Sequence, residues 1–166
     1  MSPERRWTTH SPRGIVGRGD RRWGIVPYRT VEHTADVGLE IESESAQALF
    51  AEAAEAFRAL TAGATEGAPV AHHHEMTLTA PDLAGLLVVW LNELLFLWDA
   101  RGHAVRQIAA LTITTAPTPR LEAVVALDFV PAGAGLGDDI KGVTYHDLRL
   151  ERRADGVFFA RILFDV

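Results

Sequence analysis

The sequence predicts a single α+β domain of mainly antiparallel sheets packed with two principal helices. Two segments carry apolar residues at the three- and four-residue spacing of a helix, whereas most others alternate apolar and polar residues with the period of two that is typical of strands. The strand-like segments cluster after each helical one, which favours an α+β fold over a parallel α/β fold. The length of 166 residues suits one domain.

Residues 1–22 are expected to form a flexible extension ahead of a domain of residues 23–166. The extension is rich in Arg and Gly, has no helical or strand period, and lacks the apolar stretch of about 7–15 residues that a signal peptide needs. Residues 1–30 hold seven Arg and two acidic residues, whereas residues 31–166 hold nine basic and twenty acidic ones. An acidic body repels phosphate and attracts basic proteins, so RNA binding by the body is not expected. An arm that touches RNA is the alternative use of the extension.

The first elements of the domain are expected to be two strands and a helix. Tyr28–Glu32 is a short extended run, and Val37–Glu42 alternates apolar residues with Gly and Glu. Over residues 46–60 apolar side chains then recur on one face, which predicts an amphipathic surface helix packed on a sheet. Ser43 or Ser45 can cap its first turn, since a serine hydroxyl accepts a hydrogen bond from a free amide.

A third strand and a second helix follow. His72–Thr79 alternates Met and Leu with polar residues, and Pro81-Asp82 opens the most apolar segment, Leu83–Trp98. This segment has 16 residues and is interrupted by Asn92 and Glu93, whereas a membrane-spanning helix needs about 20 apolar residues. It is therefore expected to be a buried central helix.

The rest of the chain is predicted to be strands. The Asp155-Gly156 pair is a strong hairpin signal between the last two of them, and Pro131–Gly137 reads as a loop. The strand-like segments are Val105–Thr115, Leu121–Val130, Ile140–Arg152 and Val157–Val166.

Several kinds of site are excluded or disfavoured. The chain has no cysteine, so a metal ion would have to be held by oxygen or imidazole. No Gly-rich phosphate loop, nucleophile elbow or paired-His helix motif is present. The run His72-His73-His74 is expected to be structural or solvated, because neighbouring side chains on a strand point to opposite faces and cannot converge on one ion.

Three residues remain candidates for a functional site. Asp36 lies between two strand-like runs, Asp165 stands beside the terminal carboxylate of Val166, and Lys141 opens the strand that begins at Ile140. Each also has a structural explanation. An Asp in a turn often bonds nearby amides, an acid at the end of a strand is usually just solvated, and Lys141 can pair with a neighbouring Asp.

Four segments, in this order along the chain, resemble the archease family. The resemblance extends from about Tyr28 to the last residue and includes the His-Thr-Ala-Asp run of the family. The segments are Tyr28–Val37, Asp82–Leu95, Ile140–His146 and Phe164–Val166. The chain departs from the family's usual pattern in the loop before Ile140 and at Gly142, where the family usually has Ala.

The resemblance implies a cytoplasmic activator of an RtcB-type RNA ligase, and not an enzyme. Such a protein promotes guanylylation of the ligase and its multiple turnover in tRNA splicing and RNA repair, and it meets RNA only through the ligase, with no membrane involved. The resemblance also implies a divalent metal site formed by Asp36, Asp165 and Val166, with Lys141 contacting phosphate or an acidic partner group.

Carboxylates are hard oxygen donors that suit calcium or magnesium, with zinc as the alternative metal. His33 and His146 are candidates for a supporting role beside the metal ligands. Two other functions stay open: a stand-alone metal-dependent phosphohydrolase that uses Asp36 and Asp165, and a chaperone-like module for RNA-processing enzymes. The hydrolase would also need a general base or an activated water.

Overall fold

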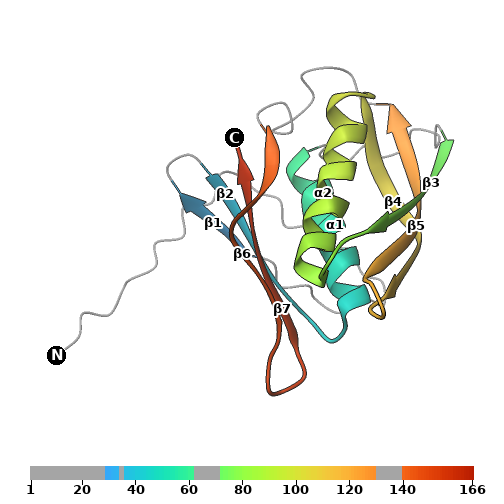
Figure 1. Cartoon of the computed structure of the whole chain (residues 1–166). Coiled ribbons are helices and arrows are strands. Elements are labelled where there is room, and N and C mark those ends of the chain that lie inside the picture. Colours follow the sequence, from blue (N-terminus) through green and yellow to red (C-terminus); the bar gives the residue numbers. More distant parts are fainter. Residues whose placement is uncertain (1–28, 34–35, 62–71, 130–139) are drawn as a thin grey trace, which may run out of the picture.

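The computed structural model describes residues 29–33, 36–61, 72–129 and 140–166, with side chains described from residue 38 onward. This part of the chain forms two helices and seven strands (Figure 1). The extension expected at residues 1–22 and the loop expected at residues 131–137 lie outside the described residues. The elements are β1 (Arg29–His33), β2 (Asp36–Ser43), α1 (Ala46–Thr61), β3 (His72–Thr79), α2 (Leu83–Asp99), β4 (His103–Thr114), β5 (Arg120–Phe129), β6 (Gly142–Arg152) and β7 (Phe158–Asp165).

The strands form two antiparallel sheets with the helices between them, as Figure 1 shows. The four-stranded sheet has the order β1-β2-β7-β6, and the three-stranded sheet has the order β3-β5-β4. The last strand, β7, is therefore inserted between β2 and β6. The predicted α+β fold of antiparallel sheets packed with two principal helices is confirmed.

Both helices begin at a capping side chain, and Ser45 is one of the two caps that the sequence suggested for α1. Ser45 Oγ accepts a hydrogen bond from the amide of Ala48 at 3.1 Å, and the Asp82 carboxylate accepts one from the amide of Gly85 at 2.7 Å. Helix α1 contacts strands of both sheets, whereas the sequence suggested a surface helix on one sheet. Its neighbours on two sides explain why seven of its apolar residues are buried.

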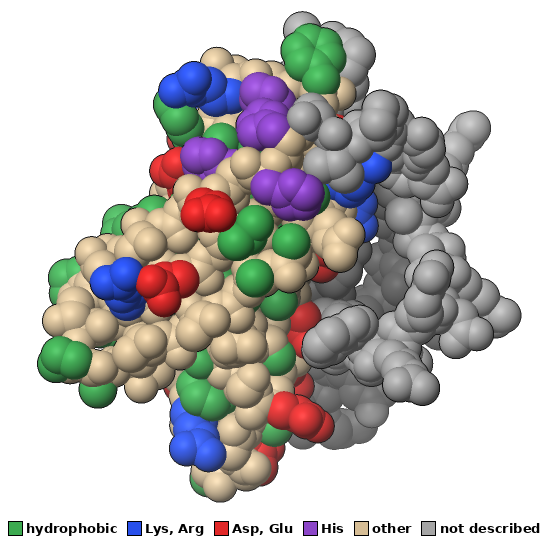
Figure 2. All heavy atoms as spheres, turned by 90° about the vertical axis from the view of Figure 1, so that its right-hand side faces the viewer, with side chains coloured by type: hydrophobic (Ala, Val, Ile, Leu, Met, Phe, Trp, Pro, Cys, Tyr) green, Lys and Arg blue, Asp and Glu red, His purple; other side chains and the backbone are tan. Residues whose placement is uncertain are grey.

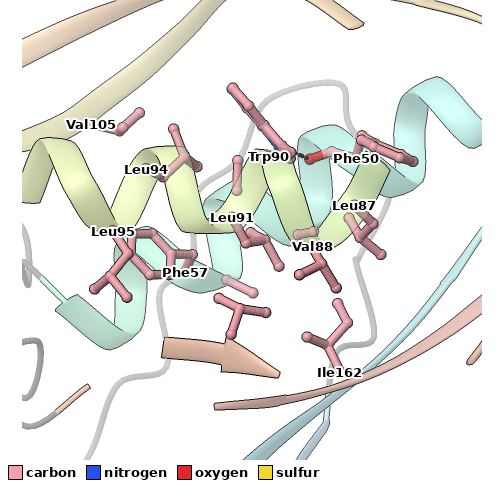
Figure 3. Packing of buried hydrophobic residues seen from close by; sticks show 14 of the residues in the cluster. Phe50, Phe57, Leu87, Val88, Trp90, Leu91, Leu94, Leu95, Val105 and Ile162 are labelled. Atoms are coloured by element: carbon pink, nitrogen blue, oxygen red, sulfur yellow. Dashed lines mark hydrogen bonds between the residues drawn. The ribbon is translucent and has the colours of Figure 1, made fainter. Parts of the chain in front are cut away.

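Helix α2 forms the centre of the hydrophobic core (Figure 3). It contacts both sheets and α1, which explains why it is apolar nearly all the way round. Trp90 and Leu91 are fully buried, and the Trp90 indole donates a hydrogen bond to the Phe50 carbonyl of α1 at 3.1 Å. No helix in the described ranges is long and apolar enough to cross a membrane.

Strand β6 pairs with β7 in two separate stretches. Gly142 to Thr144 pair with the end of β7, then the register breaks, and pairing resumes at Arg149. Within this bulge Asp147 has a φ of 50°, and its carboxylate lies 3.2 Å from Arg161 Nε on β7. The first paired stretch of β6 is therefore only three residues long, and it leads directly into the candidate site.

Candidate metal centre

The ends of four strands meet in one row across the four-stranded sheet. His33 of β1 is the register partner of Asp36 of β2, and Asp36 is the register partner of Asp165 of β7. On its other side Asp165 is the register partner of Gly142 of β6. The structure thus brings together Asp36 and Asp165, which are far apart in the sequence. Asp36 is the first residue of β2, whereas the sequence had suggested a turn position.

The alternation of β7 determines which side of the sheet Asp165 faces. Ile162 and Phe164 are fully buried on the face towards the helices. Asp165 is the next residue after Phe164, so it points to the opposite face, where it is exposed. Directly opposite positions of an antiparallel pair share a face, with Cβ atoms about 4.5–5.5 Å apart. The register therefore assigns Asp36 and Asp165 to neighbouring positions on one face, next to the half-buried Val166.

Lys141 joins the same end of the sheet. Its amide donates a hydrogen bond to the Asp165 carbonyl oxygen at 2.7 Å, and its side chain is exposed. At the next residue, Gly142, an added Cβ would meet no atom of the described residues within 4 Å, its chain neighbours aside. The described part of the chain thus leaves room for a small side chain at Gly142, beside Asp165 in the row.

The two candidate histidines occupy different places. His33 lies in the row through its pairing with Asp36. His146 lies in the β6 bulge, where it is exposed and its amide donates to Thr144 Oγ1 at 2.9 Å. Among the described side chains, which do not include that of Asp36, no group of three or more His, Asp and Glu is placed to hold a metal ion.

The histidines of β3 gather away from this row. Histidine side chains cluster at one end of the three-stranded sheet (Figure 2), and the rings of His72 and His103 meet edge to face with centroids 4.8 Å apart. Burial lowers the pKa of His103, and the nearby His72 and Arg101 lower that pKa further. Nothing in the sequence pattern indicated this contact between β3 and β4.

Asn92 is a further residue at the site end of the fold that the sequence did not assign. Its side-chain amide nitrogen donates to the Val143 carbonyl at 3.2 Å, and its side-chain oxygen accepts from the Val143 amide at 3.1 Å. The one feature of the sequence that could have pointed to Asn92 is that this polar residue interrupts the most apolar predicted helix.

Comparison with known proteins identifies the family to which this chain belongs. Residues 28–166 match the sequence model of the Archease protein family. The chain belongs to the archease family. Among curated relatives, archease from Methanosarcina acetivorans is 31% identical over 150 residues, which cover 84% of this chain and 95% of that protein. Archease from Pyrobaculum islandicum is 31% identical over 144 residues, with coverages of 85% and 96%.

A solved structure shares the fold of this archease-family chain. The solution structure of Methanobacterium thermoautotrophicum protein 1598 superposes with a TM-score of 0.68 at 24% identity, covering 84% of this chain and 98% of that one. The resemblance seen in the sequence is therefore confirmed at the level of family and fold.

Proposed function

We propose that this protein is a metal-binding activator of an RtcB-type RNA ligase. It would promote guanylylation of the ligase and its multiple turnover in tRNA splicing and RNA repair, without catalysing a reaction of its own. The proposal depends on one observation above all: in a chain of the archease family, Asp36 and Asp165 are register partners beside the carboxyl terminus.

The residues of the row fit a hard divalent cation. Two Asp carboxylates and the terminal carboxylate of Val166 offer only oxygen donors, which suit calcium or magnesium. Three neighbouring anions repel one another, so a cation is favoured where they meet. No described atom beyond the chain neighbours of Gly142 lies within 4 Å of a Cβ placed there, so Gly142 itself does not crowd an ion beside Asp165. Zinc is the alternative metal, and His33 could then supply an imidazole.

The residues of the row would have two roles, binding the cation and contacting the partner. Asp36 and Asp165 hold the ion, and the exposed Lys141 reaches a phosphate or an acidic group of the partner. A bound divalent cation supplies positive charge that can hold or polarise a phosphate oxygen. Because the body of the chain is acidic, it would approach RNA through a basic partner and not directly.

The test is a time course of guanylylation of a purified RtcB-type ligase with GTP and metal. Wild-type protein is expected to accelerate the reaction, and Asp165→Asn is expected to lose about 10-fold or more of that acceleration, because one metal ligand loses its charge. Equal acceleration by wild type and Asp165→Asn would contradict the proposed site.

The control variant is Glu151→Gln. Glu151 is an exposed carboxylate on the same face of the same sheet, and its register partner Phe159 lies six residues before Asp165. Six strand residues span about 20 Å. This variant is expected to activate the ligase as the wild type does. Release of phosphate from nucleotides by the protein without ligase would instead favour the phosphohydrolase.

A further inference from the structure

Asn92 is a polar residue in the middle of the most apolar helix of the protein. Both ends of its side-chain amide bond the backbone of Val143, 51 residues further along the chain. Asn has a lower helix propensity than Leu by a few tenths of a kcal/mol, so its place in α2 is not explained by helix formation. The two hydrogen bonds to β6 provide an explanation.

The pair of bonds satisfies the backbone of an edge strand where α2 packs against it. Strand β6 is the outermost strand of the four-stranded sheet, and Val143 has its register partner, Phe164, on the β7 side. The amide and carbonyl of an edge residue on the other side lack a strand partner. The Asn92 amide carries one donor group and one acceptor, so it pairs with Val143 as a further strand would.

This anchor acts on the shortest paired stretch of the sheet. Only Gly142 to Thr144 pair with β7 before the bulge interrupts the register. Lys141 precedes this stretch and bonds the Asp165 carbonyl through its amide. The two hydrogen bonds between the Asn92 side chain and the Val143 backbone are therefore a large share of what holds this stretch of β6 in place beside Asp165.

We propose that Asn92 is a positioning residue of the candidate metal centre. By fixing Val143, its side chain holds Lys141 and Gly142 beside Asp165, so that the rigid central helix sets the geometry of the row. This inference rests on the proposed function for the metal itself, while the anchoring of β6 by Asn92 can be tested without any metal.

The test compares Asn92→Ala with Trp90→Phe. Trp90 makes the matching hydrogen bond on another side of α2, to Phe50 of α1, so its replacement by Phe removes a helix-to-backbone bond without touching β6. The readouts are amide hydrogen exchange at Lys141 and Val143, followed by NMR, and calcium affinity measured by calorimetry. Neither readout depends on ligase activity.

Asn92→Ala is expected to lower the protection of the Lys141 and Val143 amides relative to Ile162, and to weaken calcium binding about 10-fold, as loss of a group that orients metal ligands does. Trp90→Phe is expected to change neither. Equal effects of the two variants on both readouts would overturn the inference, because Asn92 would then contribute only to the overall stability of the protein.

A second variant keeps the test valid if Asn92→Ala does not fold. Asn92→Asp has nearly the same shape and keeps the acceptor for the Val143 amide, but it loses the donor for the Val143 carbonyl. It is expected to reduce protection at Lys141, and full wild-type protection and affinity in this variant would contradict the inference. If wild-type protein binds no calcium while the Asn92 variants still lose protection, the proposed metal site fails and the anchor stands.

Discussion

Glu52 of α1 is a carboxylic acid whose surroundings oppose its charge. Burial raises its pKa, and the hydrogen bond donated by the Ser43 hydroxyl of β2 only partly offsets this. A raised pKa means that the folded state binds the proton more tightly than the unfolded chain. The folded state is therefore favoured most below the pKa of the unfolded chain, and this contribution is lost as the pH rises through the folded pKa.

Glu52→Gln should consequently raise the free energy of unfolding at pH 7, because the neutral amide avoids the burial cost and can still accept from Ser43. The gain should shrink as the pH falls through the pKa of folded Glu52, because the wild-type carboxyl then takes up a proton and becomes neutral too. Urea denaturation at several pH values measures this difference. Glu55→Gln, at an exposed acid paired with Arg58 at 2.9 Å, is the control and should give no gain at pH 7. A less stable Glu52→Gln protein at pH 7 would contradict this expectation.

Single residues of the candidate site could be identified from the sequence only in part. The alternation of the last strand predicts that Asp165 and Arg161 face away from the core, and the structure confirms this for the exposed Asp165. Asn92 was visible only as an interruption, because its partner Val143 is remote in sequence. No periodicity indicates which backbone group a polar side chain will reach.

At the scale of elements, helix α2 is the main source of core burial. Leu91 is fully buried between the sheets, whereas Phe96 on the same helix is 47% exposed. A buried leucine replaced by alanine loses its transfer free energy and leaves a cavity, at a cost of about 2–5 kcal/mol. A side chain that is half exposed loses much less.

Leu91→Ala is therefore expected to lower the free energy of unfolding by about 3 kcal/mol, and Phe96→Ala by clearly less. Urea denaturation followed by circular dichroism gives both values. Similar losses for the two variants would show that α2 is not buried at its centre as described.

The spacing of apolar residues in the sequence predicted the positions of the helices and strands well, but it did not predict the bulge of β6. Strand β2 extends one residue beyond each end of the strand expected at Val37–Glu42, and α2 extends one residue beyond the end of the helix expected at Leu83–Trp98. The bulge of β6 was not foreseen, since it depends on the left-handed φ of Asp147 and on its ion pair with Arg161. These tertiary features override the local pattern.

At the scale of the whole molecule, the order of the strands creates the candidate site. Placing β7 between β2 and β6 puts the end of the chain next to Asp36 and next to the start of β6. Composition and periodicity do not encode the pairing of segments more than a hundred residues apart. The resemblance to the archease family supplied the expectation that Asp36 and Asp165 act together. The sheet register makes the two residues direct partners, and their joint role stays a prediction.

If Asp36 and Asp165 share one cation, calcium titration by calorimetry should detect a single site that depends on both carboxylates. Wild-type protein is expected to bind one ion per chain, and Asp36→Asn and Asp165→Asn are each expected to weaken that same site by about 10-fold or more. Glu151→Gln should bind as the wild type does. Wild-type affinity in both Asp variants, or two ions in the wild type of which each variant loses one, would show that the two carboxylates do not hold a common ion.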